Sequence, residues 1–130
     1  MLERILYVED QHDIQEIVVL ALENLGGYTL EVCSSGEEAL TKVETFSPDL
    51  ILLDVIMPGM DGPTTLNALR NIPALHNSPV IFMTGNAQPQ EIAYLKEIGA
   101  LDVIAKPFDP MTLASQISTI WEKWYKMTDE

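Results

Sequence analysis

The feature that most constrains this fold is the alternation of short apolar runs with helical patterns, which occurs five times along the chain. The apolar runs span residues 4–8, 28–33, 50–53, 79–83 and 102–105, and each has the length of a strand. Strands that alternate with helices in this way are typical of right-handed βαβ units around a parallel sheet. We therefore predict an α/β fold. An α+β arrangement needs strands that follow one another directly, and the pattern contains none.

Local signals place the helices between these strands. Gly26 and Gly27 are expected to end the first helix, and Ser35 with Glu38 forms a capping-box pattern before the second. Apolar residues in the first helical segment recur at the spacing of one helix face. We predict that this face is buried and consists of Ile14, Ile17, Val18, Ala21, Leu22 and Leu25.

Length and charge limit the partners of the chain. Its 130 residues suit one domain, and its hydrophobic fraction of 47% is enough for a core. The net charge of −13 disfavours direct binding to nucleic acid or anionic membranes, and the apolar runs are too short to insert into a membrane. The single cysteine, Cys33, fits a reducing compartment. We expect a cytoplasmic domain whose partners are cations or proteins.

Polar residues follow four of the five predicted strands. Glu9 and Asp10 follow the first, Asp54 the third, Thr84 the fourth and Lys106 the fifth. Ligands of open α/β sheets bind outside the carboxyl ends of the strands, so these side chains are expected to converge.

The predicted cluster contains three carboxylates, which repel one another unless a cation joins them. Mg²⁺ binds few protein carboxylates, keeps several waters and accepts phosphate oxygens as further ligands. Asp54 ends a buried strand and is the natural nucleophile, while Lys106 and Mg²⁺ would neutralise charge on a transferred phosphoryl group. The Thr84 hydroxyl would donate to the same group. The constellation therefore predicts aspartyl phosphorylation.

The chain resembles the receiver domain of two-component response regulators, of the CheY-like family. The similar segments are ILYVED (5–10), PDLILLD (48–54), MPGMDG (57–62), PVIFMTG (79–85) and GALDVIAKPF (99–108). The resemblance covers the chain from about residue 3 to about 122, so it implies one receiver domain over 1–130. It also implies a flavodoxin-like sheet of strand order 2-1-3-4-5.

The resemblance assigns roles to the acidic residues. Asp54 would accept a phosphoryl group from a histidine kinase or a histidine phosphotransfer protein. Asp10 would bind Mg²⁺ directly and Glu9 through water, with Asp54 and the backbone carbonyl of Ile56 as further metal contacts.

The resemblance also implies a switch. Lys106 would pair with the phosphoryl group, Thr84 would move toward it, and the bond between Lys106 and Pro107 would be cis. Signals would pass to a downstream protein through the face formed by the fourth helix, fifth strand and fifth helix. Val103 stands where the family has its switch aromatic, so another side chain must report the state, or Thr84 moves alone.

Other function classes fit the sequence less well. A phosphatase of the haloacid dehalogenase type needs an Asp-x-Asp motif after the first strand, and flavin binding needs a phosphate cradle where Glu9 and Asp10 stand. We expect no enzyme beyond a receiver that catalyses its own phosphorylation and dephosphorylation. The alternative is a degenerate receiver that acts as a phosphorylation-independent scaffold. The position of Met1 close to the first strand favours a stand-alone protein.

An aromatic cluster ends the last predicted helix. Trp121, Trp124 and Tyr125 either pack against the core with exposed polar tips or form a docking surface for a partner.

Overall fold

Five parallel strands alternate with five helices in the computed structural model, which describes residues 1–128. The strands are β1 (Arg4–Val8), β2 (Thr29–Cys33), β3 (Leu50–Asp54), β4 (Val80–Thr84) and β5 (Asp102–Ala105). They pair in the order β2-β1-β3-β4-β5, and every pair is parallel. The α/β class and the strand order are therefore confirmed. The predicted strand bounds agree with the structure to within one residue.

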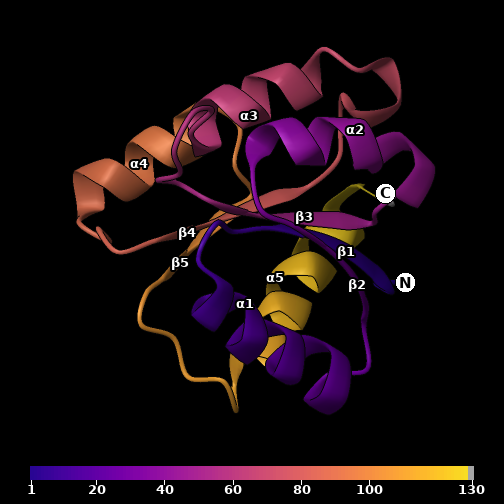
Figure 1. The fold of residues 1–130 in the computed structure, drawn as a ribbon, viewed down its shortest axis with the longest axis vertical. Helices are drawn as coiled ribbons and strands as arrows, with labels where there is room; N and C mark the ends of the chain where they lie inside the picture. Colours follow the sequence, from indigo (N-terminus) through magenta and orange to yellow (C-terminus); the bar gives the residue numbers. More distant parts are fainter. Residues whose placement is uncertain (129–130) are drawn as a thin grey trace.

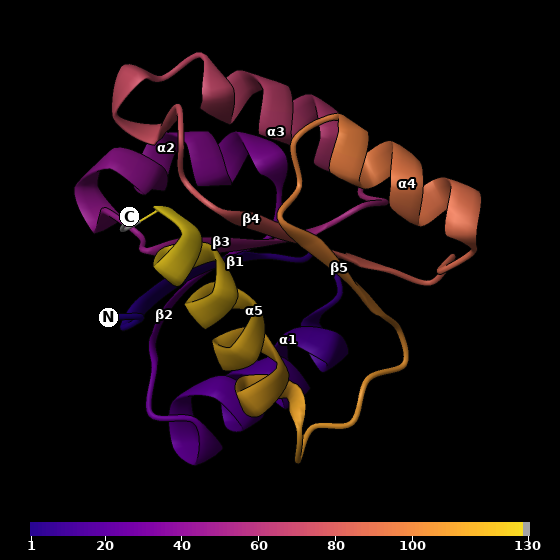
Figure 2. The same cartoon turned by 180° about the vertical axis from the view of Figure 1, so that it is seen from behind.

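The helices form a layer on each face of the sheet. They are α1 (His12–Val19), α2 (Gly36–Phe46), α3 (Gly62–Arg70), α4 (Pro89–Glu97) and α5 (Leu113–Thr128). α2, α3 and α4 cover one face, and α1 and α5 cover the other (Figure 1, and from behind in Figure 2). A π-helical turn, Leu20–Leu25, continues α1, and a 3₁₀ turn, Pro73–Leu75, follows α3.

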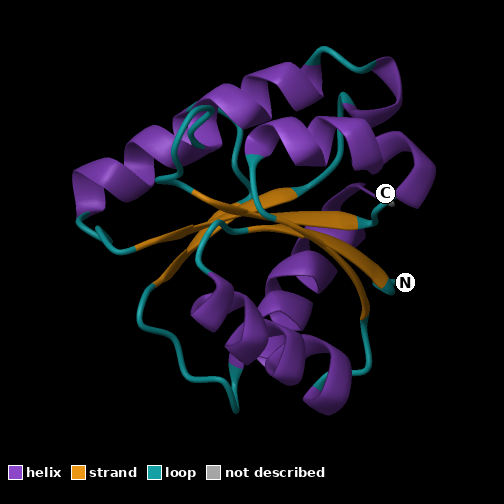
Figure 3. Ribbon diagram, in the orientation of Figure 1, coloured by secondary structure: helices purple, strands orange, loops and turns teal. Residues whose placement is uncertain are grey.

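Each face of the sheet has its own apolar core. Every residue of β3 and β4 is buried, as expected for central strands covered on both faces (Figure 3). Alternate residues of a strand point to opposite faces, so Leu53 and Phe82 pack toward α2, α3 and α4. Leu52 and Met83 pack toward α1 and α5. This alternation decides which layer each residue at a strand end faces.

The predicted buried face of the first helix is correct only in part. Val18, Ala21 and Leu22 are fully buried, but Ile17 is 44% exposed and Leu25 is 54% exposed. Ile17 lies at the border of the apolar stripe. Leu25 would fall near the centre of the stripe in a regular α-helix, but the π-helical turn has more residues per turn and rotates it toward solvent.

The predicted cap of α2 forms with one change of partner. The Ser35 hydroxyl accepts a hydrogen bond from the Glu38 N–H at 3.0 Å. The Glu38 carboxylate accepts from the Ser34 N–H at 2.6 Å, whereas the capping-box pattern pairs it with the N–H of Ser35. Both bonds satisfy N–H groups at the start of the helix.

Arg70 ties three segments together at the amino edge of β4 and β5. Its guanidinium donates to the carbonyl of Leu75 at 3.2 Å, to that of Ser78 at 2.7 Å and to that of Gly99 at 3.3 Å. These bonds join the end of α3 to the segment before β4 and to the turn between α4 and β5.

None of the helices in residues 1–128 has the length and apolar character needed to cross a membrane.

Candidate functional site

Three strands deliver their terminal side chains to one layer. The ladder continues past the strand ends, since the Glu9 N–H donates to the Cys33 carbonyl at 2.9 Å and the Lys106 N–H donates to the Thr84 carbonyl at 2.8 Å. Strand alternation places Glu9, Asp54 and Lys106 on the face covered by α1 and α5. The convergence predicted from the sequence is therefore present for these three residues.

Lys106 joins two carboxylates. Its Nζ lies 2.8 Å from Oε1 of Glu9 and 2.7 Å from Oδ1 of Asp54. The Glu9 side chain is fully buried, and those of Asp54 and Lys106 are 8% and 18% exposed. One ammonium thus faces two buried carboxylates, so one negative charge of the two is not compensated.

Asp10 completes an acidic cluster. One carboxylate oxygen from each of Glu9, Asp10 and Asp54 lies within 4.8 Å of the others. Asp10 is half-buried and lies at the solvent side of the cluster. An oxygen-only donor set of this charge suits a hard divalent cation such as Mg²⁺, so the residues present fit the predicted metal. The Ile56 side chain is 78% exposed in the loop after Asp54.

Burial and charge perturb the groups of the cluster. Burial is the main cause that raises the pKa of Glu9, and the nearby Asp54 charge adds to it although Lys106 opposes both. Burial likewise raises the pKa of Asp54, with a contribution from Asp10. Burial by itself lowers the pKa of Lys106, but its hydrogen bonds to Asp54 and Glu9 outweigh that effect and raise it. Burial and mutual repulsion therefore oppose the charged form of the carboxylates, and Lys106 favours it.

Thr84 is the last residue of β4 and points to the other face of the sheet from the acidic cluster. Strand alternation places it on the face of Phe82, toward α4. Its hydroxyl accepts a hydrogen bond from the Asn86 N–H at 3.0 Å and lies 3.4 Å from the Asn86 carbonyl oxygen. The hydroxyl is thus engaged by the loop that leads to α4.

The other predicted switch residues lie along β5 and just after it. The bond between Lys106 and Pro107 is cis, as predicted. Val103 is half-buried and packs on the core beneath α2, α3 and α4. It is therefore on the same face as Thr84.

Tyr7 is the member of this region that the sequence analysis did not single out. Its side chain is fully buried, and its hydroxyl makes no hydrogen bond within the described residues. The signal in the sequence is a phenol in an otherwise aliphatic strand, two residues before Glu9.

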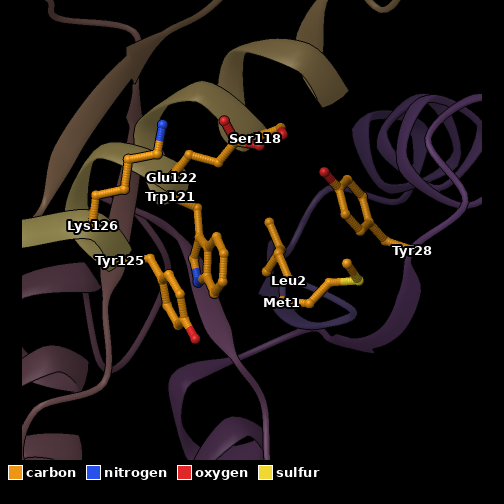
Figure 4. Close-up of a pocket in the computed structure, with 8 residues that line it drawn as sticks. All are labelled: Met1, Leu2, Tyr28, Ser118, Trp121, Glu122, Tyr125 and Lys126. Atoms are coloured by element: carbon orange, nitrogen blue, oxygen red, sulfur yellow. The ribbon is translucent and has the colours of Figure 1, made fainter. Parts of the chain in front are cut away.

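The aromatic cluster of α5 packs at the opposite edge of the sheet. Trp121 is 7% exposed and stacks on Tyr125 with ring centroids 4.7 Å apart. It lies beside Leu2 in a groove lined also by Met1, Tyr28, Ser118, Glu122 and Lys126 (Figure 4). Trp121 thus packs in the core while Tyr125 is 42% exposed, and the docking surface stays a prediction.

A five-stranded parallel sheet of this order, with carboxylates and a lysine at its carboxyl edge, defines the CheY-like class of flavodoxin-like domains. The chain belongs to the response regulator receiver domain family, whose sequence model matches residues 5–118. The family is a signalling domain of two-component systems.

Individual relatives agree with this assignment. The chain is 35% identical over 120 residues to the alkaline phosphatase synthesis transcriptional regulatory protein PhoP of Bacillus subtilis. The matched region covers 92% of this chain and 49% of that protein. The chemotaxis response regulator CheY4 of Vibrio cholerae has a TM-score of 0.84 at 30% identity, with 92% of this chain and 99% of that chain covered. A signal receiver domain of a histidine kinase from Syntrophus aciditrophicus has a TM-score of 0.79 at 36% identity, with 93% of this chain and 91% of that chain covered. The chain spans about half the length of the curated relatives it matches.

Proposed function

We propose that residues 1–130 form one receiver domain that acts as a phosphorylation-controlled switch in the cytoplasm. The observation that carries the proposal is the bridge from Lys106 to Asp54 and Glu9, with Asp10 beside it. This arrangement presents a buried carboxylate next to a fixed ammonium and a divalent-cation donor set. No packing requirement gathers three carboxylates in this way.

Asp54 is the proposed acceptor. One of its carboxylate oxygens attacks the phosphorus of a phosphohistidine on a histidine kinase or histidine phosphotransfer protein. The phosphorus–nitrogen bond breaks as the new phosphorus–oxygen bond forms, and the donor imidazole retains the electron pair and takes up a proton. The product is an acyl phosphate on Asp54.

Mg²⁺, held by Asp10, Asp54 and the Ile56 carbonyl with Glu9 through water, would supply positive charge opposite the phosphoryl oxygens. Lys106 turns from its present partners to one of these oxygens. The formal charges of three carboxylates, Mg²⁺ and one lysine sum to zero, so the site tolerates the extra negative charge of an acyl phosphate.

The phosphodonor is proposed to approach beside Lys106. An apolar groove there is lined by Ile14, Ile17, Lys106, Pro107, Phe108 and Pro110. The exposure of Ile17, wrong as a core prediction, gives this groove an apolar wall. A helix that carries a phosphohistidine would find apolar contacts within reach of the ammonium.

The signal is proposed to leave through α4, β5 and α5. Thr84 leaves Asn86 and donates to the phosphoryl group, which frees the loop before α4. Leu95 is the one fully buried residue of α4. A helix attached so lightly is a suitable element to shift and alter contacts with a downstream protein.

The test is the intact mass of the protein after incubation with Mg²⁺ and acetyl phosphate. We expect a gain of one phosphoryl group that requires Mg²⁺, is absent in Asp54→Asn and persists in Asp13→Asn, which changes an exposed carboxylate on α1. Beryllofluoride binding by the same variants covers the case of rapid hydrolysis. A wild-type protein that gains no mass and binds neither Mg²⁺ nor beryllofluoride would contradict the switch and leave a scaffold.

A further inference from the structure

Tyr7 carries an unsatisfied polar group in the interior of the molecule. Its side chain has no exposed surface, and its hydroxyl is one of two buried side-chain polar atoms without a hydrogen bond in the described residues. The other is Nε1 of Trp121, at the opposite edge of the sheet. A buried hydroxyl without a partner lowers stability compared with phenylalanine at the same position. Its presence therefore suggests a partner in another state of the protein.

The position of Tyr7 identifies that partner as Glu9. The two residues are two apart on one strand, and the ladder to β2 continues through Glu9, so both side chains point to the face of α1 and α5. Burial raises the pKa of Tyr7, the charges of Glu9 and Asp54 raise it further, and a hydrogen-bond contact with Glu9 adds the smallest part. The phenol therefore faces Glu9 already, but the contact lies outside hydrogen-bond geometry in the state described.

Glu9 is paired with the Lys106 ammonium, which turns to the phosphoryl group in the proposed reaction. In the state described, Lys106 binds Oε1 of Glu9 at 2.8 Å, and the Gln11 N–H reaches Oε2 only at 3.3 Å. The same ammonium is required by the phosphoryl group on Asp54. When Lys106 turns to that group, the fully buried Glu9 carboxylate loses its strongest donor.

We propose that Tyr7 is a positioning residue whose hydroxyl donates a hydrogen bond to the Glu9 carboxylate when Lys106 moves to the phosphoryl group. The inference rests on the proposed function. The tyrosine keeps Glu9 satisfied and oriented toward the metal after the lysine has left. In the resting state Lys106 holds Oε1 of Glu9, and the contact between the phenol and Glu9 stays outside hydrogen-bond geometry.

The contrasting interpretation is that Tyr7 only fills the core. The two interpretations differ in what Tyr7→Phe does in different states, because this change removes one oxygen and preserves the ring. A core-filling role gives the same effect in every state. The positioning role gives no loss in the resting state and a loss once Lys106 is withdrawn.

The first experiment is a double-mutant cycle of Tyr7→Phe and Lys106→Met, measured by urea unfolding at pH 8 in EDTA. With Lys106 present, we expect Tyr7→Phe to be as stable as the wild type or more stable. With Lys106→Met, we expect Tyr7→Phe to raise the unfolding equilibrium constant on the order of tenfold, the size of a hydrogen bond to a charged group. Equal effects in both backgrounds would overturn the proposal. This cycle does not depend on phosphorylation.

The second experiment keeps Lys106 and measures beryllofluoride binding with Mg²⁺ by fluorescence titration. We expect Tyr7→Phe to weaken binding on the order of tenfold, while Tyr28→Phe, a control at the opposite edge of the sheet, leaves it unchanged. Unchanged binding by Tyr7→Phe would overturn the proposal even if Lys106→Met does not fold. Failure of the wild type to bind would instead contradict the proposed function, and the cycle would then decide the role of Tyr7.

Discussion

Replacing Asp54 with asparagine is expected to make the metal-free protein more stable, although it removes one side of an ion pair. Two unit charges 4.8 Å apart repel by about 3.5 kcal/mol at an effective dielectric constant of 20. Glu9 and Asp10 both lie within this distance of Asp54, so the repulsion totals about 7 kcal/mol or more. Attraction to Lys106 at 2.7 Å contributes about 6 kcal/mol. The small excess of repulsion, together with the cost of burying the charge, favours a neutral side chain.

The expected gain for Asp54→Asn is about 1–2 kcal/mol in the free energy of unfolding at pH 8 in EDTA. The amide oxygen of asparagine still accepts a hydrogen bond from Lys106, so that donor keeps a partner. Because the pKa of Asp54 is raised in the folded state, the penalty of its charge is present above that pKa and disappears as the pH falls through it. The advantage of the variant is therefore expected to shrink on acidification.

Urea unfolding monitored by tryptophan fluorescence measures this difference. Glu122→Gln is the control, since it also removes one negative charge, at an exposed position of α5. Added Mg²⁺ is expected to stabilise the wild type more than Asp54→Asn and so reduce or reverse the difference. If Asp54→Asn is no more stable than the wild type in EDTA while the control is neutral, the attraction of Lys106 outweighs the repulsion and the reasoning is wrong.

Three further predictions concern the frame around the site. Cys33 is fully buried, and burial raises its pKa to about 12, so iodoacetamide at pH 8 should modify it only after unfolding, as measured by mass. Gly62→Ala would place a Cβ 2.5 Å from the backbone oxygen of Asp54, which should cost about 1–3 kcal/mol in thermal unfolding. The pKa of Glu38 is lowered by its hydrogen bond from Lys42, so its contribution to stability is present above its ordinary value of 4.5 and is lost as the pH falls through the folded pKa. Glu38→Gln should therefore be less stable than the wild type at pH 7, and urea titrations at lower pH should show the difference shrink.

The sequence predicts the sheet and the acidic cluster because both follow from strand ends. The carboxyl ends of parallel strands meet at one edge, so the residues at the ends of β1, β3 and β5 must approach one another whatever the details of packing. Glu9, Asp54 and Lys106 are therefore found together as expected.

Features that depend on local geometry were beyond the sequence pattern. Leu25 has the period of a buried residue, but a π-helical turn shifts its phase, and no residue type marks such a turn. The hydroxyl of Thr84 is held by Asn86, because a strand-end hydroxyl bonds whichever loop N–H comes within reach. Tyr7 reads as a strand residue, and only its lack of a partner in three dimensions marks it.

Arg70 anchors the segment at the carboxyl end of α4, which leaves the amino end freer to move. The carbonyl of Gly99 that it holds lies two residues after the end of α4, and Leu95, the buried residue of α4, is near the same end. Any tilt of the helix must therefore pivot there. A helix of nine residues is about 13 Å long, so a tilt of about 10° would displace the far end by roughly 2 Å. That far end follows the loop that holds the Thr84 hydroxyl, so in the proposed switch the largest displacement of α4 would lie next to the group whose release starts it.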